Sequence, residues 1–290
     1  MKILIVTRLS HTRMDGFRYG RAFESLGHEV DYQYIDTEFV DKGYDFVYFM
    51  DNAEWHIYPK IFDIPCYYYA GDVGMDLGRR CVTQSANMDY VFCAQKWSVD
   101  LFNNSEWLPS AHDSCLHEKF TFNKESDRLM LASSVGDYRG PGRSDRHNIV
   151  KLIDEEFLRN EVYLSNSTQY KWLNNIYCNS CCVLNYNSFR PSLKYKDINL
   201  RIWEASGYGT VVITYDNINN GLNELGFFDK INCLTYTSDE EAIDLIRWVE
   251  NNKEEALEMS KNAFDLVNEK HTYINRAKVI LDYYIKNKDN

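Results

Sequence analysis

Residues 197–214 read DINLRIWEASGYGTVVIT, a pattern that predicts a short helix followed directly by a β-strand. The helix is expected from Asn199 to about Ser206, because Asp197 can cap its start and the glycines of GYG can end it. The residues VVIT that follow are expected to form a buried strand. A helix that leads into such a strand is typical of α/β proteins.

The same alternation of strand and helix runs through the rest of the chain. In the first half, apolar runs such as KILIVT at 2–7 and IPCYYYAG at 64–71 alternate with stretches that can be helical, among them NAEWHIYPKIF at 52–62 and KWSVDLF at 96–102. A second series of strands begins at RLMLASSVG, 128–136. This alternation predicts an α/β fold of two tandem Rossmann-like, doubly wound domains, with a cleft between them and a helical C-terminus.

The polar, irregular segment at 105–127 separates the two series of strands. We therefore expect an N-terminal domain over 1–120 and a second domain over 121–272. A terminal helix over 273–290 follows, which can pack back on the first domain. The chain is strongly helical from Ser238 onward, where an acidic first turn precedes apolar residues at helical spacing.

The composition excludes several classes of protein. A net charge of −11 opposes nonspecific attraction to nucleic acid or anionic membranes. No apolar run approaches the roughly 20 residues of a membrane span, and MKILIVT is too short for a signal peptide, so a cytoplasmic location is expected. The eight cysteines are too sparse for a disulfide scaffold, and Cys66, Cys93 and Cys182 lie in apolar runs, where a reduced thiol packs like a small hydrophobe.

A charged face of the helix in 197–214 is the first candidate site. Asp197, Arg201 and Glu204 are spaced by four and three residues and share that face. As a solvated surface ladder, each pair would contribute only about 0.2–0.5 kcal/mol. As a ligand site, Glu204 would accept hydrogen bonds from two ribose hydroxyls, Arg201 would orient it or bind phosphate, and Asn199 would lie beside them. The spacing is compatible with both interpretations.

This segment resembles the donor-site signature of GT-B glycosyltransferases, in particular the CgeB-like, spore-maturation type. Four further stretches also resemble that family in the expected order: GHEV at 27–30, YDFVYFMD at 44–51, SEWLPSAHD at 105–113 and HTYINRA at 271–277. The resemblance implies a GT-B fold with the acceptor side in the first domain and the donor in the second. It also implies that a nucleotide-diphosphate sugar is the co-substrate and that no other cofactor is needed. Among such sugars, a UDP-sugar is the first candidate.

The resemblance further implies that Glu204 holds the donor ribose. Two features depart from the family pattern. Lys196 stands eight residues before Glu204, where many relatives carry a glutamate, and Asp197 lies one place later. RLSHTRMDG replaces the glycine pair that often follows the first strand.

Two basic loops are candidates for binding the diphosphate. GDYRGPGRSDRHN follows an expected strand, and there Gly136 permits close backbone approach while Arg139 and Arg143 supply charge before a helix N-terminus. The second loop includes Lys194 and leads into the helix of 197–214. Either segment could instead be an ordinary solvated loop. No metal is expected, because helix dipoles and arginines can carry the phosphate charge.

An inverting sugar transfer needs a general base for the acceptor hydroxyl. Asp72 is the first candidate, since it follows IPCYYYAG and so lies at the carboxyl end of an expected strand. His11 is the second, in the loop after the first strand, where Asp15 also lies. A surface imidazole and a helix cap are the structural alternatives for His11 and Asp15.

The resemblance implies that the protein is a glycosyltransferase, most simply a hexosyltransferase, that moves a sugar from a nucleotide-diphosphate sugar to an acceptor hydroxyl. A glycan, protein or small-molecule acceptor fits the acidic chain better than DNA. A nucleotide-sugar epimerase on the same fold and a non-catalytic protein that binds sugar nucleotides or glycans are the alternatives. The sequence leaves open whether the sugar is transferred with inversion or retention.

Overall fold

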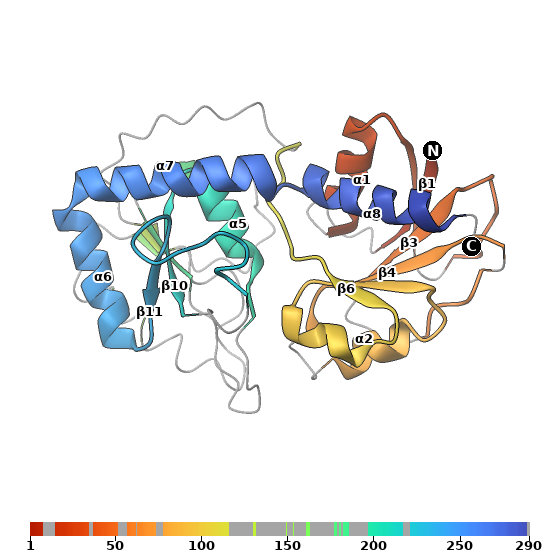
Figure 1. Cartoon of the computed structure of the whole chain (residues 1–290), viewed down its shortest axis with the longest axis horizontal. Coiled ribbons are helices and arrows are strands. Elements are labelled where there is room, and N and C mark those ends of the chain that lie inside the picture. Colours follow the sequence, from red (N-terminus) through yellow and green to blue (C-terminus); the bar gives the residue numbers. More distant parts are fainter. Residues whose placement is uncertain are drawn as a thin grey trace. The chain divides into compact units, whose positions relative to one another are not determined.

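The structure is a computed structural model of the 290-residue chain, shown in Figure 1. It describes residues 1–7, 15–34, 37–51, 57–61, 63–73, 78–115, 130–131, 149, 153, 161–162, 177–178, 180, 182–185, 197–216 and 221–288. The chain forms two compact units. Unit 1 consists of Met1–Glu118 and Thr272–Asn290, and unit 2 consists of Lys119–His271.

Unit 1 is built on a parallel six-stranded sheet in the order β2-β1-β3-β4-β5-β6. Its strands are β1 (Lys2–Val6), β2 (Glu29–Gln33), β3 (Phe46–Met50), β4 (Cys66–Ala70), β5 (Tyr90–Cys93) and β6 (Ser105–Trp107). Of these, β1 and β4 confirm the strands expected from the apolar runs at 2–7 and 64–71. The expectation that 105–127 is irregular is wrong at β6. A three-residue strand at the edge of a sheet carries little apolar signal in the sequence. The direction of strand addition reverses between β1 and β3, and ligands of open α/β sheets bind at the carboxyl ends around such a point.

Helices cover both faces of this sheet, as Figure 1 shows. On one face, α1 (Asp15–Ser25) and α8 (Tyr273–Asn287) pack on alternate residues of the strands. On the other face, α2 (Arg79–Gln84) contributes Cys81 to the hydrophobic core. Because both faces are buried, β3 and β4 are apolar at every position.

The segment between β3 and β4 differs from the expectation. Residues 57–61 are not helical, so the predicted helix over 52–62 is wrong in the part that the structure describes. Pro59 disfavours helical geometry at Tyr58. The Tyr58 side chain is instead buried and donates a hydrogen bond to the backbone oxygen of Met50. The other expected helix, at 96–102, is confirmed as a 3-10 helix over Lys96–Leu101.

The last helix is anchored in unit 1 at its first turn. Thr272 caps α8 through a capping box with Asn275, and the backbone N–H of Tyr273 donates to the oxygen of His112 at 3.0 Å. The side chain of Arg276 is buried and donates to the backbone oxygen of Pro109 at 2.8 Å. These bonds join the C-terminal helix to the segment that follows β6.

Unit 2 contains a parallel sheet in the order β11-β10-β9 and a parallel pair, β7-β8. These are β7 (Met130–Leu131), β8 (Glu161–Val162), β9 (Cys182–Asn185), β10 (Val211–Tyr215) and β11 (Leu234–Tyr236). β7 lies within the stretch at 128–136 and β10 includes the VVIT stretch at 211–214, both of which were expected to be strands. The described helices are α5 (Leu200–Gly207), α6 (Asp239–Asn251) and α7 (Lys253–Lys270).

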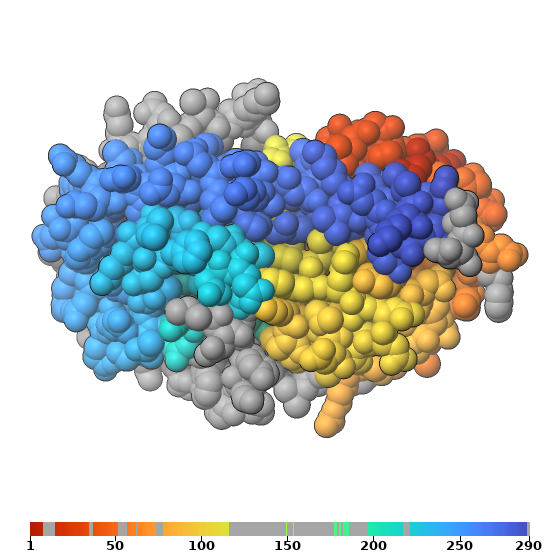
Figure 2. Space-filling view, in the orientation of Figure 1, coloured from red at the N-terminus to blue at the C-terminus, as the bar shows by residue number. Residues whose placement is uncertain are grey.

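The helices at the end of unit 2 are amphipathic, as their sequence predicts. Ser238 caps α6, whose Ile243, Ile246 and Val249 are buried against the sheet. Figure 2 shows the outward-facing residues of α6 and α7, in blue, on the surface of the unit. None of the helices in the described part of the chain is long and apolar enough to cross a membrane.

Candidate functional site

The helix α5 begins one residue later than its sequence suggests, and a different residue caps it. The Asn199 side chain accepts a hydrogen bond from the backbone N–H of Arg201 at 3.1 Å, which makes Asn199 the N-cap. The assignment of this cap to Asp197 is therefore wrong. Asn199 has extended backbone geometry immediately before Leu200, the first helical residue, as an N-cap requires.

The apolar side of α5 is fixed in the core of unit 2. Trp203 and Ile202 are fully buried, and the Trp203 ring lies 4.9 Å from the ring of His271 and 5.6 Å from that of Phe227. Glu204 and Arg201 are only partly buried. The helix therefore presents these two charged residues from a rigid support.

Arg201 is held by Asn185, which was not predicted from the sequence as a site residue. Its Nη1 atom donates to Oδ1 of Asn185 at 2.9 Å, and Asn185 Nδ2 donates to Oγ1 of Thr214 at 2.9 Å. Asn185 ends β9 and pairs with Thr214 of β10, and both residues are fully buried. The available signal was an amide at the carboxyl end of an otherwise apolar strand, where functional residues of α/β folds gather.

The remaining candidates on the donor side cannot be placed beside this network. Gly136, Arg139, Arg143 and Lys194 lie outside the residues that the structure describes, and so does His11 in unit 1.

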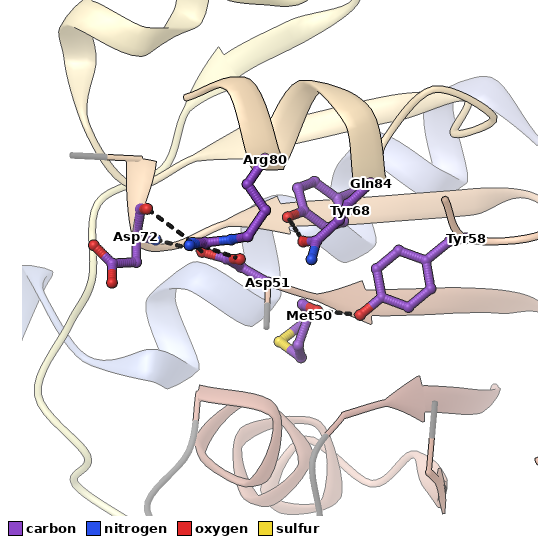
Figure 3. Close-up of polar contacts among 7 residues, drawn as sticks. All are labelled: Met50, Asp51, Tyr58, Tyr68, Asp72, Arg80 and Gln84. Carbon is purple, nitrogen blue, oxygen red and sulfur yellow. Dashed lines mark hydrogen bonds and ion pairs between the residues drawn. The ribbon is translucent and has the colours of Figure 1, made fainter. Parts of the chain in front are cut away.

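Asp72 lies at the carboxyl end of β4, where it was expected, and two charged residues hold its backbone (Figure 3). Its N–H donates to Oδ2 of Asp51 at 2.7 Å, and its oxygen accepts from Nη2 of Arg80 at 3.0 Å. The same Nη2 atom lies 3.1 Å from each oxygen of the Asp51 carboxylate. Asp72 is exposed, and Figure 3 shows its carboxylate directed away from the ion pair.

The ion pair of Asp51 and Arg80 is buried, with side chains only 7% and 3% exposed. Burial raises the pKa of Asp51 to about 6, against the opposing effects of the Arg80 guanidinium and the Asp72 N–H. Neither Asp51 nor Arg80 was predicted from the sequence as a site residue. Asp51 follows the apolar run of β3 directly, so its position at a strand end was a usable signal.

A second carboxylate lies close to the same strand end. Asp15 is the first residue of α1, and its Oδ1 accepts a hydrogen bond from the hydroxyl of Tyr273 at 2.7 Å and lies 3.4 Å from Nη1 of Arg18. Its Oδ2 lies 3.5 Å from where a Cβ on Gly71 would stand. Burial raises the pKa of Tyr273 well above its usual value, so this hydroxyl stays protonated and donates to Asp15. Asp15 thus lies beside Gly71, the residue that precedes Asp72.

Comparison with known proteins gives one match to a family and several to solved structures. Residues 141–282 match the model of a family described as glycosyl transferase-like. This part of the chain, just under half of its 290 residues, is therefore similar to glycosyltransferases. The match includes α5 with Arg201 and Glu204, as well as β9 with Asn185. No curated protein matches the sequence.

Solved glycosyltransferase structures share the fold over almost their whole length. HepE of Anabaena, crystallised with UDP and glucose, has a TM-score of 0.66 at 12% identity, over 99% of this chain and 100% of that one. Sucrose-phosphate synthase of Thermosynechococcus elongatus has a TM-score of 0.64 at 12% identity, over 98% of each chain. T4 phage BGT, crystallised with its UDP-glucose substrate, has a TM-score of 0.60 at 14% identity, over 98% of this chain and 99% of that one. These similarities confirm the expected GT-B fold.

Proposed function

We propose that this glycosyltransferase transfers a hexose from a UDP-sugar to an acceptor hydroxyl, as a relative of the CgeB-like group. Unit 2 binds the donor and unit 1 provides the acceptor side. The observation that carries the proposal is the placement of Arg201 and Glu204 on a rigid helix, with Arg201 bonded to the end of β9, within the region that matches the family. The UDP and UDP-glucose bound by HepE and BGT support the choice of donor.

Within this proposal, Glu204 accepts hydrogen bonds from the two ribose hydroxyls of the donor. A carboxylate has two oxygens that can each accept such a bond, and its partial exposure leaves it accessible. Arg201 stabilises the diphosphate together with the basic loops that contain Gly136, Arg139, Arg143 and Lys194. Asn199 shapes the start of the helix through its cap, with Asp197 two residues before it.

The proposed base is Asp72. In an inverting transfer its carboxylate takes the proton of the acceptor hydroxyl as that oxygen bonds to the anomeric carbon of the sugar. The bond from this carbon to the diphosphate oxygen breaks, and the departing UDP keeps the electron pair. The exposed carboxylate of Asp72, on a backbone fixed by Asp51 and Arg80, supports this role. His11 and Asp15 are the other candidates.

Substitution of Glu204 tests the donor site. We expect Glu204→Ala to abolish measurable turnover and to weaken UDP binding by at least about 100-fold, since it removes two hydrogen bonds to a charged group that contribute about 1.5–3 kcal/mol each. Calorimetry with UDP and product analysis with UDP-sugars would measure both effects. The control is Glu258→Ala, which removes an exposed carboxylate from α7. Unchanged turnover in Glu204→Ala would refute the proposal.

The choice of acceptor requires a separate experiment. Release of UDP that depends on an added acceptor would distinguish transfer from epimerisation, which consumes no acceptor, and from simple binding, which releases nothing. A panel of glycans, hydroxylated proteins, small molecules and DNA would identify the acceptor class. The net charge of −11 favours the first three over DNA.

A further inference from the structure

The buried residue Asn185 joins the ends of all three strands of the sheet β11-β10-β9 in unit 2. Asn185 is the last residue of β9, its Nδ2 donates to Thr214 of β10, and its backbone oxygen accepts from the hydroxyl of Tyr236 at 3.3 Å. Tyr236 is the last residue of β11. The remaining polar atom of the side chain, Oδ1, accepts from Arg201. Each polar atom of this amide therefore has a defined partner.

These partners determine which way the amide faces. A guanidinium has only donors, so the atom of Asn185 that meets Arg201 must be the oxygen. The nitrogen then faces Thr214, whose hydroxyl can accept. Because Thr214 fixes the nitrogen of the Asn185 amide, the oxygen of that amide is a rigid acceptor for the Arg201 guanidinium.

A neutral acceptor orients Arg201 without neutralising it. Arg201 makes no ion pair among the residues that the structure describes, and one of its five N–H groups is used by Asn185. The others can form the paired hydrogen bonds by which guanidinium groups bind phosphate oxygens. An aspartate or glutamate in place of Asn185 would hold the guanidinium equally well but would cancel its charge.

We infer that Asn185 is a positioning residue that fixes Arg201 against the diphosphate of the donor, so that Arg201 recognises diphosphate rather than orienting Glu204. This inference rests on the proposed function, because it requires that unit 2 bind a nucleoside diphosphate. Asn185 is not among the site residues predicted from the sequence, and its bond to Arg201 favours diphosphate binding over the orientation of Glu204.

Binding of UDP, UMP and uridine to the full-length protein tests the inference. We expect Asn185→Ala to weaken UDP binding about tenfold and to leave uridine binding unchanged, so that the preference for UDP over uridine falls. Arg201→Ala should have the same signature. The double variant should bind UDP no more weakly than Arg201→Ala alone, because the amide acts through the guanidinium.

Two further variants separate positioning from folding. Asn185→Asp keeps an acceptor for Arg201 while it adds a negative charge, so it should also lose preference for UDP. Tyr236→Phe removes a hydrogen bond to the backbone of Asn185 but leaves the bond to Arg201, and it should keep the preference. Circular dichroism and thermal unfolding would identify variants that fail to fold, in which case Asn185→Asp supplies the comparison.

The outcomes distinguish the inference from the proposed function. If the unmodified protein binds UDP more tightly than uridine but the Asn185 variants keep that ratio, the inference is wrong and the donor site stands. An equal loss of affinity for all three ligands would show a structural role and also overturn the inference. If the unmodified protein binds none of them, the proposed function fails and the inference fails with it.

Discussion

The carboxylate of Asp51 and the guanidinium of Arg80 form a buried ion pair that holds both sides of one peptide segment. Asp51 accepts the N–H of Asp72 at 2.7 Å, and Arg80 donates to the oxygen of Asp72 at 3.0 Å. The pair thereby fixes the backbone that carries the proposed base while leaving its carboxylate exposed. The contribution of this ion pair to stability and the titration of Asp51 can both be measured.

Loss of the arginine should destabilise the protein. Arg80→Met leaves the Asp51 carboxylate buried without its partner, and removal of one member of a buried pair costs about 3–5 kcal/mol. Urea unfolding followed by circular dichroism would measure this loss. Arg79→Met is the matched control, because Arg79 is the neighbouring residue of α2 and is exposed. Equal stabilities of the two variants would show that the pair contributes little.

Asp51 should make stability depend on pH in a weakly acidic window. Its pKa is raised to about 6 in the folded protein, whereas an unfolded aspartate titrates near about 3.9. Between these values the folded state binds more protons than the unfolded state, so the contribution of Asp51 to stability falls as pH rises from about 4 to about 6 and is constant above.

Unfolding free energies measured across that window would check the sign. Asp51→Asn should remove this part of the pH dependence, since an amide does not titrate. A carboxyl NMR signal from Asp51 with a midpoint near pH 4 would contradict the expectation directly.

The two carboxylates at the end of β4 can be separated by kinetics. If Asp72 is the base, Asp72→Asn should lower kcat by about 10²- to 10⁴-fold with little change in the KM for donor. Asp15→Asn should then have a smaller effect on kcat, because it retains an oxygen acceptor for Tyr273. Asp100→Asn, at an exposed residue of the 3-10 helix, is the control. A reversed order of the first two variants would assign the base to Asp15.

Trp203 should contribute strongly to the stability of unit 2. It is fully buried in contact with the rings of Phe227 and His271, and truncation of such a side chain to alanine costs about 3–5 kcal/mol. Thermal or urea unfolding of Trp203→Ala would measure the loss. Trp248→Ala should cost less, since Trp248 is only partly buried against the same unit's core.

Apolar runs in the sequence were sufficient to locate β1 and β4 in unit 1 and β10 in unit 2. Strands buried on both faces are apolar at consecutive positions, and this signal does not depend on neighbours distant in the chain. The caps of α6 and α8 are likewise local, since Ser238 and Thr272 bond to residues within the first turn. The edge strand β6 was missed because it is short and not fully buried.

By itself, the sequence determined the α/β class, the position of α5 and the candidacy of Glu204 and Arg201, because helical spacing and strand burial are properties of short segments. Only the tertiary structure decided that Arg201 bonds to Asn185 and that Arg80 and Asp51 hold Asp72. Arg201 lies 16 residues from Asn185 in the sequence. Asp51 lies 29 residues from Arg80 and 21 residues from Asp72. The order and register of the parallel strands bring them together, and short segments of sequence do not encode which strand ends become neighbours.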